Sequence, residues 1–125
     1  MTVTAGMPVL DDAVLADLLA LDEDGTFLQD LFTTYLEQAE SALKDIHDAV
    51  EDFDAGRLRR AAHYLGGASA NIGAMKVAAA CRELELARSG EAAAKALTTA
   101  IEHEAHVAAA AIRAAGAHLA IAENA

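Results

Sequence analysis

Apolar residues recur at steps of three and four along most of this chain, which is the period of an amphipathic α-helix. Five segments with this period predict helices over residues 12–20, 26–53, 55–72, 74–88 and from 91 to between 115 and 121. The second segment carries the longest stripe, at Leu28, Leu31, Tyr35, Ala39, Ala42, Ile46, Val50 and Phe53. The stripe of the third lies at Leu58, Ala61, Ala62, Leu65, Ala68, Ser69 and Ile72, and that of the fifth at Leu97, Ile101, Ala108, Ile112 and Leu119.

Polar residues and glycines separate these segments. Asp54 is a natural N-cap for the third helix, Gly73 suits its C-terminal end, and Ser89-Gly90 ends the fourth. Because the connections are short, neighbouring helices should be antiparallel. We therefore predict an all-α fold, an up-down-up-down four-helix bundle with a short additional N-terminal helix. Residues 1–10 are expected to form a flexible tail, and residues 11–121 a single domain.

Composition narrows the classes of partner. The chain is rich in alanine, the best helix former, and has one proline. Nine Lys and Arg against twenty Asp and Glu leave no basic surface for a nucleic acid or an anionic membrane, so we expect protein partners. The single cysteine, the absence of a signal-peptide pattern and the short apolar runs predict a cytoplasmic protein. A monomer is expected for a small acidic bundle.

The third segment holds the candidate chemistry, in the stretch AAHYLGGASANIG (residues 61–73). At 100° per residue His63 points away from the apolar stripe. Its neighbours one and two turns away are Arg59, Arg60, Gly66, Gly67 and Ala70. Two glycines inside a helix cost about 2 kcal/mol relative to alanine. A surface cleared beside an exposed imidazole would let another protein bring a phosphoryl group to it, since neutral imidazole is a nucleophile and the arginines would offset phosphoryl charge.

The segment AAHYLGGASANIGAMKVAAACRELELARSG (residues 61–90) resembles the histidine-containing phosphotransfer (HPt) domain. The residues that match the family pattern are Ala62, His63, Leu65, Gly67, Gly73, Cys81, Leu84, Glu85 and Gly90. The resemblance implies a four-helix bundle in which His63 is phosphorylated on Nε2. It also implies that Glu85 orients the imidazole through the other ring nitrogen and that Gly67 opens access. A carboxylate on Nδ1–H fixes the tautomer and raises the basicity of Nε2.

One position departs from the family pattern. The family has lysine three residues after the histidine, where its ammonium can meet the phosphoryl group, and here that residue is Gly66. We take three arginines as candidate phosphoryl-stabilising residues in its place: Arg59, Arg60 and Arg82. The candidate partner-binding residues are Tyr64, Gly66 and Ala70.

The resemblance implies a phosphorelay intermediate that carries a phosphoryl group on His63 between receiver-domain aspartates of two-component signalling proteins. The implied partners are receiver domains of response regulators, a hybrid sensor histidine kinase, or both. Without a Gly-rich nucleotide site or room for a kinase domain, the chain is expected to be a phosphocarrier with no autokinase activity. It is expected to need no cofactor, since Mg²⁺ would belong to the receiver partner.

Other interpretations stay open at this point. Because Gly66 replaces the lysine, the chain could be a non-catalytic HPt-like adaptor that binds receivers without being phosphorylated. Close helix packing fits Gly73 and Gly90, which look like helix ends, and we favour it less for Gly66 and Gly67, which face away from the stripe. Glu85 could be an ordinary surface carboxylate. The segment from Glu102 to His106 looks metal-like, but its histidines are three apart with no second ligand pair, so we predict no metal site. Cys81 fits a small core residue.

Overall fold

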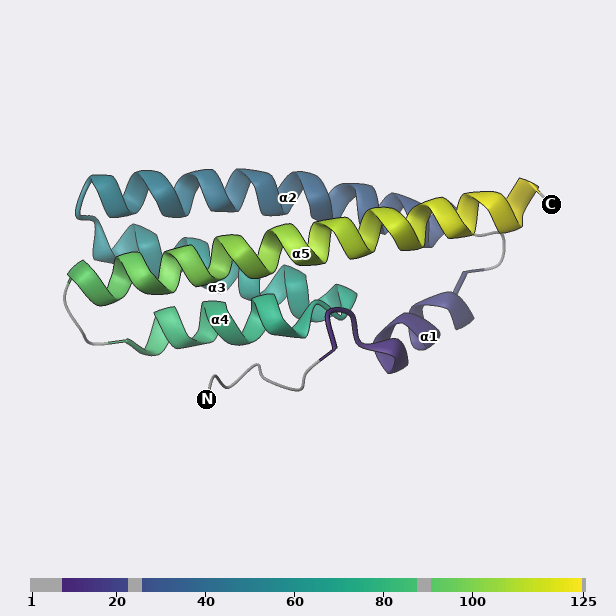
Figure 1. The fold of residues 1–125 in the computed structure, drawn as a ribbon, viewed down its shortest axis with the longest axis horizontal. Coiled ribbons are helices and arrows are strands. Elements are labelled where there is room, and N and C mark those ends of the chain that lie inside the picture. Colours follow the sequence, from purple (N-terminus) through teal and green to yellow (C-terminus); the bar gives the residue numbers. More distant parts are fainter. Residues whose placement is uncertain (1–7, 23–25, 88–90, 125) are drawn as a thin grey trace.

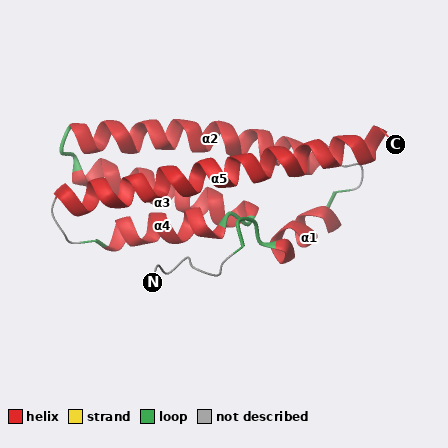
Figure 2. Cartoon of the chain, in the orientation of Figure 1, coloured by secondary structure: helices red, strands yellow, loops and turns green. Residues whose placement is uncertain are grey.

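The computed structural model describes residues 8–22, 26–87 and 91–124, and every regular element in these ranges is a helix (Figure 1, Figure 2). The helices are α1 (Asp12–Ala20), α2 (Thr26–Glu51), α3 (Ala55–Ile72), α4 (Met75–Leu86) and α5 (Glu91–Asn124). The predicted all-α class is therefore confirmed. The prediction was also close at helix boundaries, because each helix carries a regular apolar stripe.

The four longer helices form an antiparallel bundle. Helix α2 packs against α3, α3 against α4, α4 against α5, and α5 returns to α2, which closes the ring. Helix α5 runs the length of the bundle, and its C-terminal part lies beside the start of α2 (Figure 1). Helix α1 lies outside this ring and contacts α3 near the α3–α4 turn. The predicted up-down-up-down bundle with a short additional N-terminal helix is what the chain forms.

Side-chain caps and one glycine define the helix ends around α3. The carboxylate of Asp54 accepts a hydrogen bond from the backbone N–H of Arg57 at 3.0 Å, as expected for an N-cap. Gly73 ends α3 in the left-handed region with φ 87°. The carbonyl of Gly73 accepts a hydrogen bond from the backbone N–H of Asp11 at 2.8 Å. The turn after α3 therefore also anchors the start of α1.

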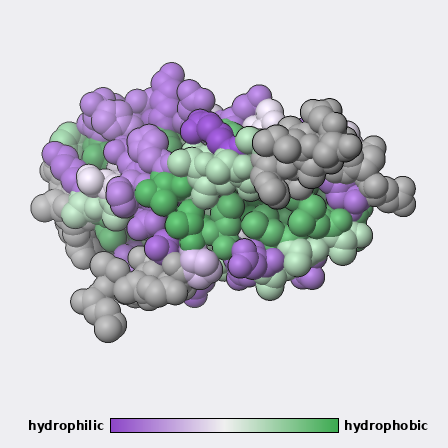
Figure 3. All heavy atoms as spheres, turned by 45° about the vertical axis from the view of Figure 1, so that its right-hand side comes forward, coloured by the Kyte–Doolittle hydropathy of each residue, from purple (hydrophilic) through white to green (hydrophobic). Residues whose placement is uncertain are grey.

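The core follows the predicted stripe of α3 and most of that of α2, where Phe32 and Ala49 are buried and the predicted Leu31 and Val50 only partly so. Its largest fully buried side chains are Leu28, Ile46, Leu65, Ile72, Ile101, Ile112, Val77, Cys81 and Ser69. Tyr35 from α2 and Ser69 from α3 share a buried hydrogen bond of 2.7 Å between their hydroxyl oxygens, so both polar groups are satisfied inside the bundle. In a space-filling view, apolar residues also form a band across one face of the molecule (Figure 3).

Three boundaries differ from the expectation. Helix α2 ends at Glu51, and Phe53 adopts φ 55° with 72% of its surface exposed, so it is not a core residue. The chain reverses direction here before Asp54 caps α3. The helix therefore ends before the last apolar residue of the predicted stripe. Helix α4 ends at Leu86, two residues early, whereas α5 continues to Asn124. The predicted stop at Ser89-Gly90 and the side chain of Leu119 lie outside the described residues.

Of the predicted flexible tail, residues 1–10, the structure describes residues 8–10, and residues 1–7 lie outside the described range. Of the rest, Val9 and Leu10 pack against the core and are half-buried. Residues that pack against the bundle therefore include two that precede residue 11, the predicted start of the domain. Among the described helices, none combines the length and apolar content that crossing a membrane requires.

Candidate functional site

His63 is at the middle of α3, on the side opposite its buried stripe. Ala62 and Leu65, its neighbours along the helix, are fully buried, whereas the imidazole is 81% exposed. The 100° rotation per residue explains this contrast, since a residue between two core positions of a helix can point outward. The ring is therefore accessible to another molecule, as predicted from the sequence.

Glu85 holds one nitrogen of this ring. It lies in the last turn of α4, its side chain is 27% exposed, and its Oε1 lies 2.5 Å from Nδ1 of His63. A carboxylate oxygen is an acceptor, so the bond assigns the proton to Nδ1 and leaves Nε2 with a free lone pair. The predicted contact between Glu85 and the imidazole is confirmed, and an ordinary surface carboxylate is excluded as the description of Glu85.

The two glycines next to the histidine have different surroundings. A Cβ atom added at Gly67 would meet nothing within 4 Å, so this position leaves open space one turn after His63. A Cβ added at Gly66 would lie 3.2 Å from Cβ of Cys81 and 3.8 Å from the carbonyl oxygen of Ala78. Gly66 therefore lies in the contact between α3 and α4. The packing explanation that the sequence disfavoured for Gly66 is correct.

The error at Gly66 has a simple cause. The helical period shows where the core stripe lies, but it does not show how closely the adjacent helix approaches the edge of that stripe. Gly66 is half-buried, as is Ala70, so neither presents much surface to a partner. Of the three predicted partner-binding residues, Tyr64 is the one with a large exposed side chain, at 51%.

The three predicted cations have exposed side chains. Within the described residues, neither Arg59 nor Arg60 nor Arg82 forms an ion pair. The guanidinium of Arg60 lies 3.3 Å from where a Cβ of Gly56 would be, so it extends toward the start of α3 and away from His63.

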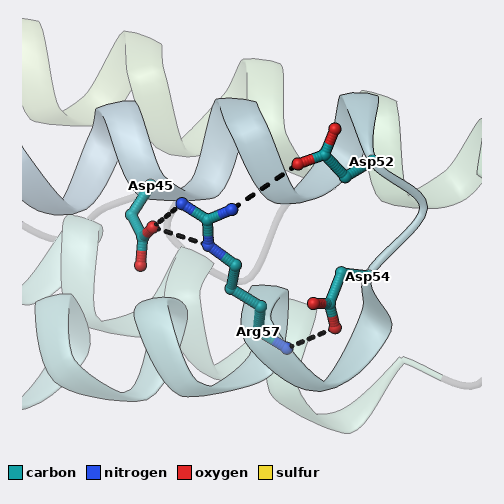
Figure 4. A network of polar contacts seen from close by, with 4 residues as sticks. All are labelled: Asp45, Asp52, Asp54 and Arg57. Atoms are coloured by element: carbon teal, nitrogen blue, oxygen red, sulfur yellow. Dashed lines mark hydrogen bonds and ion pairs between the residues drawn. The ribbon is translucent and has the colours of Figure 1, made fainter.

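A fourth arginine, Arg57, is not among the predicted cations, and its guanidinium is paired with two aspartates. Arg57 donates from Nε to Asp45 at 2.7 Å and contacts Asp52 at 3.6 Å, while its own backbone N–H is capped by Asp54 (Figure 4). The hydrogen bond with Asp45 raises the pKa of the Arg57 guanidinium above its usual value. This network ties α3 to α2, so Arg57 has a structural role and is not free to meet a phosphoryl group.

Tyr64 separates two hollows along the groove between α2 and α3. The larger, of about 370 Å³, has no charged residue in its lining, which consists of Leu31, Thr34, Tyr35, Gln38, Tyr64, Ala68, Asn71 and Ile72. The other, of about 290 Å³, includes Asp45 and Arg60. The groove between α2 and α3 therefore has an uncharged hollow of mixed apolar and polar lining and a second hollow that includes charged residues, with Tyr64 lining both.

Cys81 and the segment from Glu102 to His106 were also considered as chemical sites. Cys81 is fully buried, and burial, followed by the charge of Glu85, raises its pKa to about 12, so its thiol stays neutral near pH 7. It is a core residue, as predicted. Around residues 102–106, as in the rest of the described chain, no three His, Cys, Asp or Glu side chains are grouped to hold a metal ion.

Comparison with known proteins agrees with this geometry. The family model of the Hpt domain matches residues 30–118. This chain belongs to the Hpt domain family. The matched range contains α3 and α4, and therefore both members of the His63–Glu85 pair.

Two relatives of this Hpt domain are informative. Multistep phosphorelay regulator 1 of Schizosaccharomyces pombe is 32% identical over 79 residues, which are 62% of this chain and 27% of that protein. The chain thus spans about a quarter of the length of that relative. The crystal structure of histidine-containing phosphotransfer protein B (HptB) from Pseudomonas aeruginosa PAO1 superposes with a TM-score of 0.81 at 32% identity. That likeness covers 90% of this chain and 98% of the other.

Proposed function

We propose that this Hpt domain is a phosphorelay intermediate, which carries a phosphoryl group on Nε2 of His63 between aspartates of receiver domains. The observation that carries the proposal is the pairing of an 81% exposed imidazole with Glu85 through Nδ1. Family membership and the similarity to a phosphorelay regulator support it.

The geometry supplies the chemistry directly. The lone pair of Nε2 attacks the phosphorus of a receiver aspartyl phosphate, the bond from phosphorus to the aspartate oxygen breaks, and the aspartate leaves as a carboxylate. Phosphorylation makes the ring cationic, and the carboxylate of Glu85 on Nδ1–H balances that charge. Transfer to a second receiver reverses the step. We expect the Mg²⁺ required for phosphoaspartate chemistry to be bound by the receiver.

The partner is a receiver domain, of a response regulator or of a hybrid sensor kinase, and it docks over the groove between α2 and α3. The uncharged hollow is lined by Tyr64, the exposed residue that follows His63, and its partly apolar lining suits an apolar patch around the receiver's aspartate. The open position at Gly67 lets the two backbones approach closely. This domain acts as a monomer in that complex.

Phosphotransfer from an isolated receiver tests the proposal. A receiver is phosphorylated with a labelled small-molecule donor, freed of that donor and mixed with this protein. We expect acid-labile, base-stable phosphate on the wild type and none on H63Q. The H47Q variant is a matched control, because His47 is also an exposed helical histidine, with Glu51 3.4 Å from its ring. It should be labelled like the wild type, and ATP alone should label neither protein.

The contrary results are equally specific. If the wild type binds the receiver but never acquires phosphate, the chain is an adaptor and the proposal is wrong. If H63Q is still labelled, the phosphoryl group is on another residue and the assigned site is wrong.

A further inference from the structure

Gly66 is the position where this chain departs from the HPt pattern, and the structure gives the glycine a role of its own. A Cβ at this residue would lie 3.2 Å from Cβ of Cys81, closer than side-chain carbons normally approach, and either helix would have to move by a few tenths of an ångström. The two helices are therefore closer here than any residue other than glycine permits without adjustment.

The close contact lies one turn from the functional hydrogen bond. Helices α3 and α4 are antiparallel, so three residues forward from His63 to Gly66 correspond to four residues back from Glu85 to Cys81. Both partners of the contact are thus one helix turn away from the partners of the bond, in the same direction along the bundle. A change in the separation of the helices at Gly66 is therefore expected to change the distance between Nδ1 of His63 and Oε1 of Glu85 one turn away.

We propose that Gly66 is a positioning residue: by letting α4 approach α3 at Cys81, it holds the carboxylate of Glu85 within hydrogen-bond distance of His63 Nδ1. This inference rests on the proposed function for its effect on phosphotransfer, but its effect on the imidazole tautomer is independent of it. Gly66 touches neither the phosphoryl group nor the partner. It acts through Glu85.

The proposal predicts the effect of a methyl group at this position. In G66A the new Cβ pushes Cys81 and α4 away, the hydrogen bond from Nδ1–H to Glu85 lengthens, and the neutral ring distributes its proton more evenly between its nitrogens. G66K, which introduces the lysine of the family pattern, has the same Cβ. It is therefore expected to disturb the tautomer as G66A does, whatever its added charge contributes.

The first measurement is ¹⁵N NMR of the His63 ring at about pH 8.5, well above the ordinary pKa of histidine. We expect the Nδ1–H tautomer to dominate in the wild type and to lose population in G66A and G66K. G67A is the matched control, because it makes the same change one residue away where a Cβ meets nothing within 4 Å. Its tautomer distribution should equal that of the wild type.

A compensating variant separates positioning from general damage. G66A/C81G places the one Cβ of the contact on α3 in place of α4, with loss of the Cys81 sulfur, and should restore the wild-type tautomer, with folding checked by circular dichroism. Phosphotransfer from a receiver should be about fivefold slower in G66A, as expected for a weakened charge-assisted hydrogen bond, and should recover in the double variant.

The outcomes distinguish this inference from the proposed function. An unchanged tautomer in G66A overturns the positioning role, and slower transfer with an unchanged tautomer overturns it in favour of a partner contact. If no variant and no wild-type protein ever acquires phosphate, the proposed function fails. A tautomer lost in G66A and restored in G66A/C81G would still support the positioning role in that case.

Discussion

At the scale of single residues, the two nitrogens of His63 have different roles. Nδ1 is engaged with Glu85 at 2.5 Å, and Nε2 is left for chemistry on an exposed face. A free histidine shares its proton between the two nitrogens, so a fraction of rings would present the wrong one. The carboxylate removes that fraction and also stabilises the cationic ring formed on phosphorylation.

Replacing Glu85 tests both contributions. E85Q keeps an oxygen that can accept from Nδ1–H but removes the charge, so we expect about tenfold slower phosphotransfer from a receiver. E85A removes both and should be slower still. The measurement is the initial rate of labelling, with E83Q as control, because Glu83 is an exposed carboxylate on the same helix. Equal rates for E85A and wild type would contradict the role of Glu85.

Exposed cations are the second contribution at this scale. Arg82 is on α4 directly after Cys81, which packs against Gly66, so it is level with the position of the missing lysine. We expect the variant R59A/R60A/R82A to transfer phosphate about fivefold more slowly, a magnitude typical of exposed charge pairs. R60A alone should change the rate least of the three, since the Arg60 guanidinium extends away from His63.

Salt gives this prediction a second measurement. The difference between the triple variant and the wild type should shrink at high ionic strength, because exposed charges are screened. R113A is the control, as an exposed arginine on α5 and outside the site. A triple variant with wild-type rates would assign no phosphoryl-stabilising role to these arginines.

At the scale of helices, the sequence predicted most boundaries because local signals decide them. Asp54 and Gly73 are caps whose chemistry acts within a few residues, and both were identified. Phe53 was misplaced because the apolar period continued into a turn that needs a left-handed residue. Gly66 was misplaced because its environment is set by another helix. The His63–Glu85 pair, which also joins two helices, was predicted from the family resemblance and not from periodicity.

Two glycine-to-alanine variants should change stability in opposite directions. At Gly73, with φ 87°, an alanine Cβ would lie 3.3 Å from backbone atoms of Asp11, so we expect G73A to lower the free energy of unfolding by about 2 kcal/mol. At Gly67, in open space within α3, alanine should raise it by about 1 kcal/mol. Urea titration followed by circular dichroism measures both. A stabilised G73A would show that the turn does not need glycine.

At the scale of the whole molecule, stability and function occupy opposite faces of α3. The inner face contributes Leu65, Ile72 and Ser69 to the core, and the outer face carries His63 in solvent. Exposed substitutions seldom change stability by more than about 0.5 kcal/mol, so H63Q should unfold like the wild type in the same titration. Loss of phosphotransfer in H63Q would then report chemistry alone, and a large loss of stability would contradict this separation.

The buried thiol of Cys81 makes the stability of the bundle depend on alkaline pH. Burial raises its pKa from 9.0 to about 12 in the folded protein, so between these values the unfolded chain loses a proton that the folded chain keeps. The unfolded state is thereby favoured as pH rises. Ionisation of this thiol therefore does not affect the free energy of unfolding below about pH 9. Above that pH it should lower the free energy of unfolding by about 1.4 kcal/mol per pH unit. Tyr35, whose pKa burial also raises above 10.0, adds to the decline at higher pH.

Comparing the pH dependence of stability in the wild type and in C81A separates the effect of the Cys81 thiol from that of other groups, such as Tyr35, that titrate at alkaline pH. Alanine keeps the Cβ that contacts Gly66 and removes only the sulfur, so we expect about 1 kcal/mol lower stability at pH 7 from lost apolar burial. Between pH 9 and 10.5 the wild type should lose stability more steeply than C81A, and their two curves should converge and then cross. Urea titrations at half-unit pH intervals measure this directly. Parallel curves would contradict this prediction, because they would mean that the Cys81 thiol ionises in the folded bundle as readily as in the unfolded chain.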